Sequence, residues 1–460
     1  MRKYLSIAIV FFVFLAIILP SLLSRGMFMD GLLYAAVSKN MAFGDGNFWQ
    51  PQLSTTILNP FYEHPPLAIG MQSLFFYVFG DKYWVEDLYQ LVIAFLIGYV
   101  MIKIWKELNQ KASFSWLPLA LLLVCPLFFW SVKNGMLETT MTLFVCSGLL
   151  FYIKSMKVRW FLIFSGICIS LAFLSKGVFC LYLWGMPFVF WLVKKEVSFA
   201  RMTLDSLVLI VGSIGVIALV ILLDQQAYDY LYAYINNQVI GSVENVKTVS
   251  SRWSILIDFF SESIVIWLLL LISLVLKRIK IKQLVINKNA IALFLIVFSG
   301  VLPIMLSMKQ RGFYTLSVFP FLAIAVAILL FPFVEELLNR WSKEIRLKIQ
   351  KIVLVSSILA CLSVLVFYPK QSALRDKDLL EITDVVNKHI PAQGGIGIST
   401  QLRQNWSLIS YLARYGGYSL HLNGSNMKYY LLQKGKDELP PNTKVIDESS
   451  GFYLVQTVSQ

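Results

Sequence analysis

Three ionisable residues mark the two ends of one polar stretch, residues 29 to 67, within an otherwise apolar region. Asp30 opens the stretch, and Glu63 and His64 close it. A carboxylate can act as a general base that takes the proton of a reacting hydroxyl. A cation at the N-terminal end of a helix suits a phosphate, because unpaired backbone N–H groups face the ligand there. The residue types therefore suggest proton transfer at one end and phosphate binding at the other.

Both ends also have a purely structural interpretation. Asp30 precedes a helix-like run that stops at Gly44, so its carboxylate can be an N-cap. Pro65 and Pro66 direct the chain into a helix, and Glu63 can cap that helix. Spacing alone does not separate these interpretations from a catalytic role.

Further charged residues interrupt apolar runs later in the chain. Lys176 lies between two apolar runs, and Lys309 and Arg311 share one short polar segment. Two cations in one loop can hold a pyrophosphate or a lipid phosphate. A lysine at the end of an apolar run can equally be an interfacial anchor. Glu138 begins an apolar run, where an acid is often a partner of the helix dipole.

The composition places these residues in a membrane protein. Of the 460 residues, 58% are hydrophobic and 14% are charged, whereas roughly a quarter of the residues of a soluble domain are charged. The mean hydropathy is +0.69. The net charge of +14 comes from short clusters of cations between apolar runs, a pattern typical of topology signals, and we expect no nucleic-acid binding. The five cysteines lie in apolar runs and indicate neither a disulfide framework nor a zinc site.

Apolar runs of 17 to 25 residues are long enough to cross the bilayer core, and the sequence predicts about 11 membrane-spanning helices. They cover residues 4–23, 86–104, 114–131, 136–153, 160–175, 178–193, 203–223, 262–276, 290–308, 313–334 and 350–368. Residues 66–79 are also apolar, but a helix of that length reaches only about 21 Å. We therefore expect a juxtamembrane helix there.

The distribution of Lys and Arg orients these spans. With the N-terminus in the cytoplasm, the inner loops carry roughly twice as many cations as the outer loops. The inner set includes Lys277, Arg278, Lys280, Lys282 and Lys288. This topology places all the residues singled out above on the outer side, and we expect them to converge on the loop of residues 29 to 67.

The predicted fold is therefore an all-α polytopic membrane domain, residues 1–368, followed by a small α/β domain, residues 369–460. Strand-like runs near residues 395–399, 429–432, 444–447 and 452–455 and helical patterns near 374–389 and 404–415 support the second domain. The topology places it on the periplasmic face of a bacterial inner membrane.

Four motifs in this order resemble the GT-C glycosyltransferases of the protein O-mannosyltransferase and aminoarabinose transferase group. They are Asp30 to Ala35, Phe61 to Leu67, Leu174 to Gly177, and Lys309 to Tyr314 followed by Pro320. Members of this group use a polyprenyl-phosphate sugar as donor. The resemblance covers roughly residues 1 to 335.

The resemblance implies roles for these residues. Asp30 would be the catalytic carboxylate and Glu63 a second essential acid, which would also be the ligand of any divalent metal ion. The residues that would hold the donor phosphate are His64, Lys176, Lys309 and Arg311. Further candidates from the same motifs are Tyr34, Glu138 and Tyr314. No cofactor other than a divalent metal ion is implied.

The motifs also depart from the family pattern. An acid often follows the catalytic aspartate, where this chain has Gly31, and some members carry an arginine where it has Leu33. The aminoarabinose transferases have lysine in place of His64. The loop of residues 224–261 contains no histidine, so we expect neither a metal site in that loop nor specificity for lipid A.

We therefore expect an inverting hexosyl- or pentosyltransferase that moves sugar from a polyprenyl-phosphate donor to a lipid, glycan or protein acceptor. Its other partners would be membrane lipids. One alternative is a flippase for lipid-linked glycans, which would favour inverted repeats and charges near the midplane. Another is a polysaccharide ligase or polymerase, for which an Arg-rich outer loop with a histidine would be typical.

Overall fold

The computed structural model describes residues 2–108, 110–241, 246–276, 287–373, 375–422 and 427–458. The predicted inner cations Lys277, Arg278, Lys280 and Lys282 lie outside the described residues. The chain divides into two compact units. The membrane unit comprises Met1–Pro20, Gln90–Val132 and Glu138–Tyr368, and the loop–tail unit comprises Ser21–Tyr89, Lys133–Leu137 and Pro369–Gln460.

Seven helices among the described residues are long and apolar enough to cross a membrane. They are α1 (Arg2–Leu23), α4 (Val85–Glu107), α7 (Leu137–Ser155), α10 (Phe199–Leu223), α16 with η4 (Lys288–Leu306), η5 with α17 (Gly312–Asn339) and α18 (Lys343–Phe367). Two bent pairs raise the number to nine. The pairs are α5 (Trp116–Leu123) with α6 (Pro126–Lys133), bent by 76°, and α13 (Ser254–Glu262) with α14 (Ile264–Val275), bent by 67°.

The membrane unit also contains two shorter apolar helical segments. They are α8 (Phe161–Lys176) and η2 (Val178–Gly185) with α9 (Met186–Lys194). Each of these helices coincides with a predicted span except α13, which lies in the segment predicted as an outer loop. The other elements among the described residues of this unit are the short η1 (Ala112–Phe114), α11 (Gln225–Tyr234) and η3 (Ile235–Ile240). The structure thus confirms the all-α polytopic fold, and the chain is an integral membrane protein.

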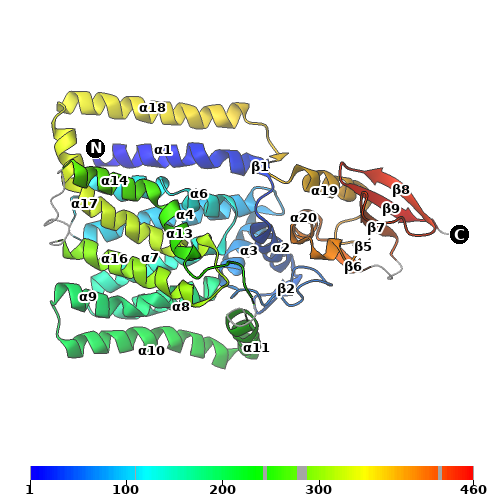
Figure 1. Cartoon of the computed structure of the whole chain (residues 1–460), viewed down its shortest axis with the longest axis horizontal. Helices are drawn as coiled ribbons and strands as arrows, with labels where there is room; N and C mark the ends of the chain where they lie inside the picture. The colour runs from blue at the N-terminus through cyan, green and yellow to red at the C-terminus, as the bar shows by residue number, and fades with distance from the viewer. Residues whose placement is uncertain are drawn as a thin grey trace. The chain divides into compact units, whose positions relative to one another are not determined.

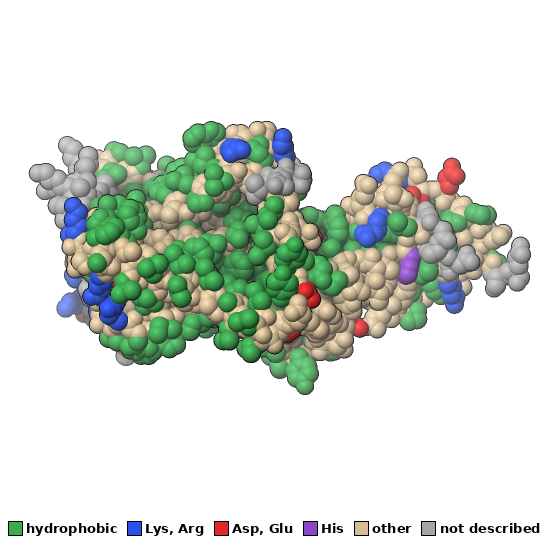
Figure 2. All heavy atoms as spheres, turned by 90° about the horizontal axis from the view of Figure 1, so that it is seen from below, with side chains coloured by type: hydrophobic (Ala, Val, Ile, Leu, Met, Phe, Trp, Pro, Cys, Tyr) green, Lys and Arg blue, Asp and Glu red, His purple; other side chains and the backbone are tan. Residues whose placement is uncertain are grey.

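Burial separates central from peripheral helices in the membrane unit. In α7, and in η5 with α17, 78% of the 18-residue apolar stretch is buried inside the protein. In α10 and in α18 the buried share is only 11%. A helix that is apolar on every side is stable either inside a protein or against lipid. Figure 1 shows α10 and α18 along opposite edges of the membrane unit. Figure 2 shows hydrophobic side chains over much of this unit, with Lys and Arg gathered at the end where α10 begins.

The first part of the loop–tail unit consists of α2 (Met29–Phe43), the hairpin of β2 (Gly46–Asn47) and β3 (Gln50–Pro51), and α3 (Leu67–Phe79). Gly44 ends α2 in the left-handed conformation, at φ 91°, as is common for a glycine after a helix. α3 corresponds to the predicted juxtamembrane helix and has only 13 residues.

The tail is a small α/β fold, as predicted. Its helices are α19 (Lys377–His389) and α20 (Trp406–Gly416), with the short η6 (Leu402–Gln404). Its strands are β5 (Gly395–Ile398), β6 (Ser419–Leu422), β7 (Tyr429–Gln433), β8 (Thr443–Glu448) and β9 (Phe452–Thr457), in the sheet order β6-β5-β7-β9-β8. β5 pairs in parallel with β6 and β7, and β9 pairs antiparallel with β7 and β8.

One hydrophobic core joins the first loop to the tail. Ala36 and Leu53 of the loop belong to the same buried cluster as Ile396 and Leu412 of the tail. A second link is a short parallel pair between β1 (Ser24–Arg25) and β4 (Ser372–Ala373). The loop was predicted to belong to the domain of residues 1–368, whereas its apolar side chains pack against the tail, and it forms one compact unit with the tail.

Candidate functional site

Asp30 lies in the first turn of α2 and is half-buried. The N-cap residue is Phe28, which makes no side-chain capping hydrogen bond. The N-cap interpretation of Asp30 is therefore wrong, because the helix begins two residues earlier than that interpretation requires. A carboxylate in this turn is still favourable, since the N-terminus of a helix carries partial positive charge.

The start of α2 rests directly on residues 133–137. The backbone N–H of Phe28 donates a hydrogen bond of 2.7 Å to Asn134 Oδ1. A Cβ atom on Gly31 would lie only 1.9 Å from the carbonyl oxygen of Asn134, closer than real side chains approach. The absence of a side chain at Gly31 therefore lets α2 pack against this segment, which explains in structural terms the departure from the family pattern there.

Tyr34 connects the two ends of the polar loop. Its ring lies 5.6 Å from the His64 ring and 6.5 Å from the Phe61 ring, centroid to centroid. Residues four positions apart lie on the same face of a helix, so Asp30 and Tyr34 share one face of α2. The structure thus brings Asp30, Tyr34 and His64 into one neighbourhood, here called the α2 group.

Glu63 and His64 lie in the bend that leads to α3. The N-cap of α3 is Pro66 and makes no side-chain capping hydrogen bond, so Glu63 stands three residues before the cap position. Both residues are half-buried. The interpretation of Glu63 as the cap of α3 is therefore wrong.

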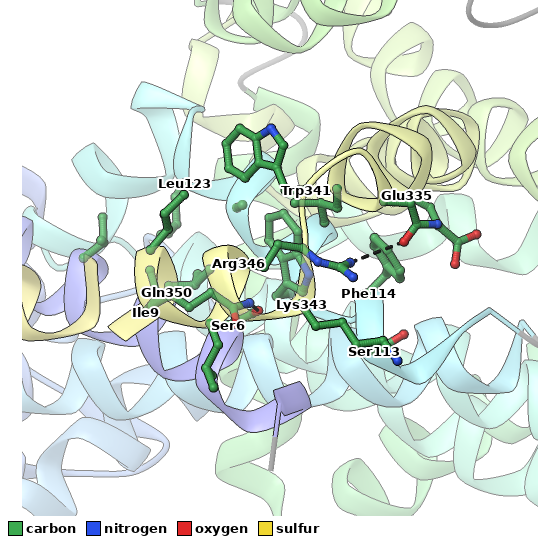
Figure 3. Close-up of a pocket in the computed structure, with 18 of the residues that line it drawn as sticks. Ser6, Ile9, Ser113, Phe114, Leu123, Glu335, Trp341, Lys343, Arg346 and Gln350 are labelled. Atoms are coloured by element: carbon green, nitrogen blue, oxygen red, sulfur yellow. Dashed lines mark hydrogen bonds between the residues drawn. The ribbon is translucent and has the colours of Figure 1, made fainter. Parts of the chain in front are cut away.

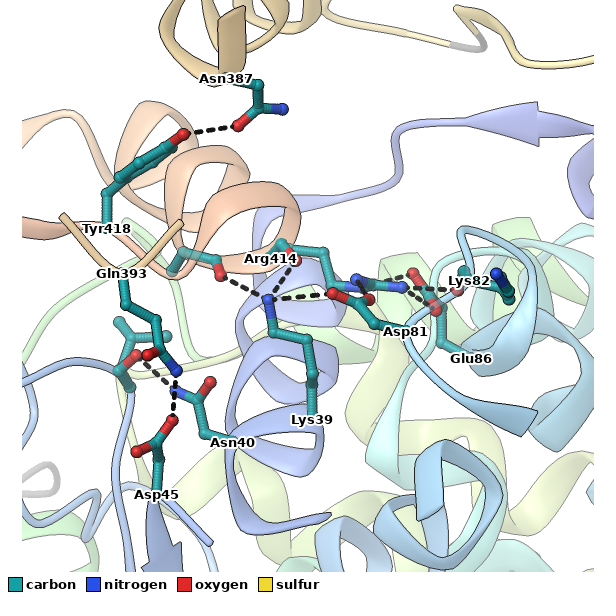
Figure 4. Close-up of polar contacts among 12 residues, drawn as sticks. Lys39, Asn40, Asp45, Asp81, Lys82, Glu86, Asn387, Gln393, Arg414 and Tyr418 are labelled. Carbon is teal, nitrogen blue, oxygen red and sulfur yellow. Dashed lines mark hydrogen bonds and ion pairs between the residues drawn. The ribbon is translucent and has the colours of Figure 1, made fainter. Parts of the chain in front are cut away.

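A buried ion-pair network fastens α20 to the start of α4 (Figure 4). Arg414 Nε and Nη2 each donate a hydrogen bond of 2.8 Å to the Glu86 carboxylate, and Nη1 donates one of 2.6 Å to Asp81 Oδ1. The Arg414 side chain is 1% exposed and that of Glu86 0%. Burial alone would lower the pKa of Arg414, but the charges of Glu86 and Asp81 raise it above its usual value. Arg414 therefore stays charged in the interior.

Lys39 extends this network to α2. Its Nζ donates a hydrogen bond of 2.8 Å to the backbone carbonyl of Arg414 and lies 3.5 Å from Asp81 Oδ2. The carbonyl belongs to the last turn of α20, where a cation is favourable. Burial, together with the nearby charge of Arg414, lowers the pKa of Lys39 to about 8. Neither Lys39 nor Arg414 was singled out from the sequence. The available signal was that each of these cations interrupts the apolar face of a helix.

In the membrane unit, Lys176 is buried rather than interfacial. Its Nζ lies 3.1 Å from Glu138 Oε1, and the two side chains are 2% and 0% exposed. The anchor interpretation of Lys176 is therefore wrong. The next residue, Gly177, has φ +93°, and a Cβ there would lie 1.7 Å from the Tyr234 hydroxyl. Only glycine fits where α8 ends.

Lys309 and Arg311 flank a buried glutamine, Gln310, to which no role was assigned from the sequence. Gln310 Oε1 accepts a hydrogen bond of 2.9 Å from the backbone of Ile255, and its Nε2 donates to the carbonyls of Arg252 and Ser307. These bonds fix the loop that carries the two cations. Lys309 Nζ lies 3.4 Å from Gln238 Oε1, and Arg311 is exposed.

Tyr314 connects this loop to the segment after Lys176. Its ring stacks on that of Phe179, with centroids 4.5 Å apart and planes at 28°. Phe179 belongs to η2, which begins just after Gly177. The structure therefore brings the Lys176 motif and the Lys309 motif together, and we call Lys176, Lys309, Arg311 and Tyr314 the cation group.

The described residues contain no group of three or more His, Cys, Asp or Glu side chains placed to hold a metal ion. The role of Glu63 as the ligand of a divalent metal ion stays a prediction. The α2 group belongs to the loop–tail unit and the cation group to the membrane unit. Their convergence on one site stays a prediction.

Comparison with known proteins agrees with the fold. Residues 63–223 match the family model of dolichyl-phosphate-mannose-protein mannosyltransferase. ArnT from Cupriavidus metallidurans bound to undecaprenyl phosphate matches with a TM-score of 0.68 at 14% identity, covering 98% of both chains. Its apo structure matches with a TM-score of 0.66 at 14% identity, covering 95% of both chains.

A more distant match is the archaeal oligosaccharyltransferase AglB from Archaeoglobus fulgidus, in complex with an inhibitory peptide and a dolichol-phosphate. Its TM-score is 0.52 at 12% identity, covering 89% of this chain and 63% of that one. No curated protein matches the sequence. The structural matches confirm the resemblance predicted from the motifs, and the chain has the GT-C fold.

We expect Arg414→Met to destabilise the loop–tail unit by about 3–5 kcal/mol, because it leaves the buried Glu86 carboxylate without a counter-ion. Hydrogen exchange of α20 and thermal unfolding would measure the loss. Adding Glu86→Gln should recover part of it. Lys377→Gln is the control, since its pair with Glu381 is exposed and worth less than about 1 kcal/mol. Equal effects of the two single substitutions would contradict a dominant role for the network.

We expect Gly31→Ala to destabilise the protein, although replacing a glycine inside a helix usually stabilises by about 0.5–1 kcal/mol. The added Cβ would overlap the Asn134 carbonyl. Gly215→Ala in α10 is the matched control, because a Cβ there meets no atom within 4 Å. Thermal unfolding of both variants tests the sign of the change in stability. A Gly31→Ala protein as stable as the parent would show that the contact between α2 and Asn134 is not tight.

Proposed function

We propose that this chain is an inverting glycosyltransferase that moves one hexosyl or pentosyl unit from a polyprenyl-phosphate donor to an acceptor hydroxyl. The main support is the likeness along 98% of the chain to ArnT, whose structure was determined with undecaprenyl phosphate bound. The match of residues 63–223 to a mannosyltransferase family model supports the same class of reaction.

The proposed reaction is a single displacement. The acceptor oxygen forms a bond to the anomeric carbon of the sugar while the bond from that carbon to the phosphate oxygen breaks on the opposite face. The electron pair leaves with the polyprenyl phosphate, and the hydroxyl proton passes to a base. A phosphate is a stable leaving anion, so cations that stabilise it are more useful than a strong acid.

Asp30 is the proposed base. It is half-buried at the start of α2, on the helix face that also carries Tyr34, and the His64 ring contacts Tyr34. Glu63, next to His64, is the proposed second acid. The aromatic contact holds the closing end of the loop against the helix that carries the base, which suits a site that must orient an acceptor hydroxyl.

Lys309 and Arg311 are the proposed contacts to the donor phosphate. The buried bonds of Gln310 hold their loop in one conformation, and Arg311 is accessible. A fixed guanidinium suits phosphate recognition because it presents several donors in one plane. Lys176 differs from these two because Glu138 already balances its charge, and its contact with the donor phosphate stays a prediction.

We further propose that the acceptor is a lipid, glycan or protein on the periplasmic side of a bacterial inner membrane, with the N-terminus in the cytoplasm. The distribution of Lys and Arg between loops supports this orientation. The tail, residues 369–460, would then be periplasmic.

Asp30→Asn should lower sugar transfer by about 10²–10⁴-fold, the usual contribution of a general base, while the protein stays folded in the membrane. Mass spectrometry of cell-envelope glycans and glycoproteins from cells that carry each variant would measure it. Asp45→Asn in the same loop is the control, because Asp45 lies outside the α2 group and accepts a hydrogen bond from Gln393. Near-normal transfer by Asp30→Asn would exclude Asp30 as the base.

Lys309→Ala and Arg311→Ala should each weaken donor binding about tenfold or more, since a hydrogen bond to a charged group contributes about 1.5–3 kcal/mol. Titration of the purified protein with a polyprenyl-phosphate sugar would measure the affinity. Lys247→Ala is the control because this exposed cation lies outside the cation group. Unchanged affinity in both variants would leave the two cations without a role in donor binding.

A further inference from the structure

A cavity of about 780 Å³ lies in the membrane unit between α1, the η1–α5 segment and α18 (Figure 3). The wall that α1 contributes runs from Ser6 through Ile9 and Val13 to Ile17. These twelve residues of helix extend about 16 Å from the first Cα to the last, close to half of the roughly 30 Å hydrocarbon core. The apolar wall therefore has the length of one leaflet.

One end of this cavity carries cations. Lys343 and Arg346 of α18 line it, and Arg346 Nη1 donates a hydrogen bond of 3.3 Å to Asn339 Oδ1. Glu335 is the acid of this end, but Lys111 Nζ already lies 2.7 Å from its carboxylate. Within the described ranges, no carboxylate lies at ion-pair distance from Lys343 or Arg346, so this end of the cavity has a net positive charge.

Two further features suit a lipid at this place. The indoles of Trp116 and Trp341 line the cavity, and tryptophan is enriched at the level of lipid head groups. α1 and α18 are peripheral, because only 22% and 11% of their 18-residue apolar stretches are buried inside the protein. They are linked by hydrogen bonds from Gln350 to Ser6 and from Cys361 to the Phe12 carbonyl.

The cavity is separate from the cation group. The loop of Lys309 and Arg311 precedes α17, and Lys343 and Arg346 follow it. α17 has 21 residues and is therefore about 30 Å long. A lipid phosphate held by Lys343 and Arg346 would thus belong to the opposite leaflet from one held by the proposed donor contacts.

We propose that this cavity binds an anionic phospholipid, with its phosphate between Lys343 and Arg346 and one acyl chain along the apolar wall of α1. The charge of the site selects the head group, because basic pockets between transmembrane helices attract anionic lipids. The length and apolar character of the wall match an acyl chain. This lipid is a bound structural ligand and takes no part in sugar transfer.

Native mass spectrometry of the full chain, titrated with phosphatidylglycerol or phosphatidylethanolamine, tests the proposal. The variant is Lys343→Gln with Arg346→Gln, and the matched control is Lys348→Gln with Lys351→Gln, two exposed cations of the same helix outside the cavity. We expect the cavity variant to bind phosphatidylglycerol about tenfold less tightly or weaker, the control to stay within about twofold, and phosphatidylethanolamine to bind weakly to all three proteins.

A second variant, Val13→Trp, fills the apolar wall and leaves both cations in place. It should also weaken phosphatidylglycerol binding. Because this variant keeps both charges, the result distinguishes blocking of the cavity from loss of charge. Unchanged binding in both cavity variants would overturn the proposal. Equal losses of phosphatidylglycerol affinity in the cavity and control charge variants would also contradict the proposal, because any cations of the helix would then attract the lipid equally well. Equal affinity for the two lipids would contradict it too, because the site would then hold an ordinary boundary lipid.

Discussion

A guanidinium withdrawn from water is stable only when carboxylates and carbonyls satisfy its donors, and Arg414 meets this condition inside the loop–tail unit. Its donors reach both Glu86 oxygens, Asp81 and the Lys82 carbonyl, at distances from 2.6 to 2.8 Å. Removing either charge would leave the other buried and uncompensated. The rest of the unit depends on this pairing, because it joins α20 of the tail to the chain segment that enters α4.

The same pairing positions the helix that carries Asp30. Lys39 binds the last carbonyls of α20 from the C-terminal half of α2, while Gly31 and Phe28 pack against Asn134 at the N-terminal end. α2 is therefore fixed at both ends within its unit. The tail thus has a structural role in holding the first loop, and this role could not be predicted from the sequence.

Hydrophobicity and charge predicted much of the fold because a membrane leaves few alternatives to apolar helices. The spans, the short apolar helix at residues 67–79 and four of the five strands of the tail sheet follow from local pattern. β6 (Ser419–Leu422) was missed, and its place in the sheet depends on parallel pairing with β5, which is distant in sequence. The shared core of loop and tail was missed for the same reason, since Ala36 and Leu412 are distant in sequence.

The candidate site was predicted by residue type and order, but the partners of its residues were not. Nothing in the sequence pairs Lys176 with Glu138 or shows that Gln310 fixes the loop between two cations, because both depend on contacts between separate helices. The cap interpretations of Asp30 and Glu63 were wrong because the helices begin two or three residues away from the predicted positions. Helix ends are the part of a helix that local sequence pattern defines least well.

Sugar transfer requires that the bond between the sugar and the phosphate of the donor breaks, whereas a flippase moves the donor intact. The most direct measurement is mass spectrometry of polyprenyl phosphate released when the purified chain, in lipid nanodiscs, is incubated with polyprenyl-phosphate sugars and cell-envelope acceptors. Release of free polyprenyl phosphate in proportion to sugar gained by the acceptor fraction is the predicted result. Donor that stays intact with every sugar and acceptor fraction would contradict a transferase.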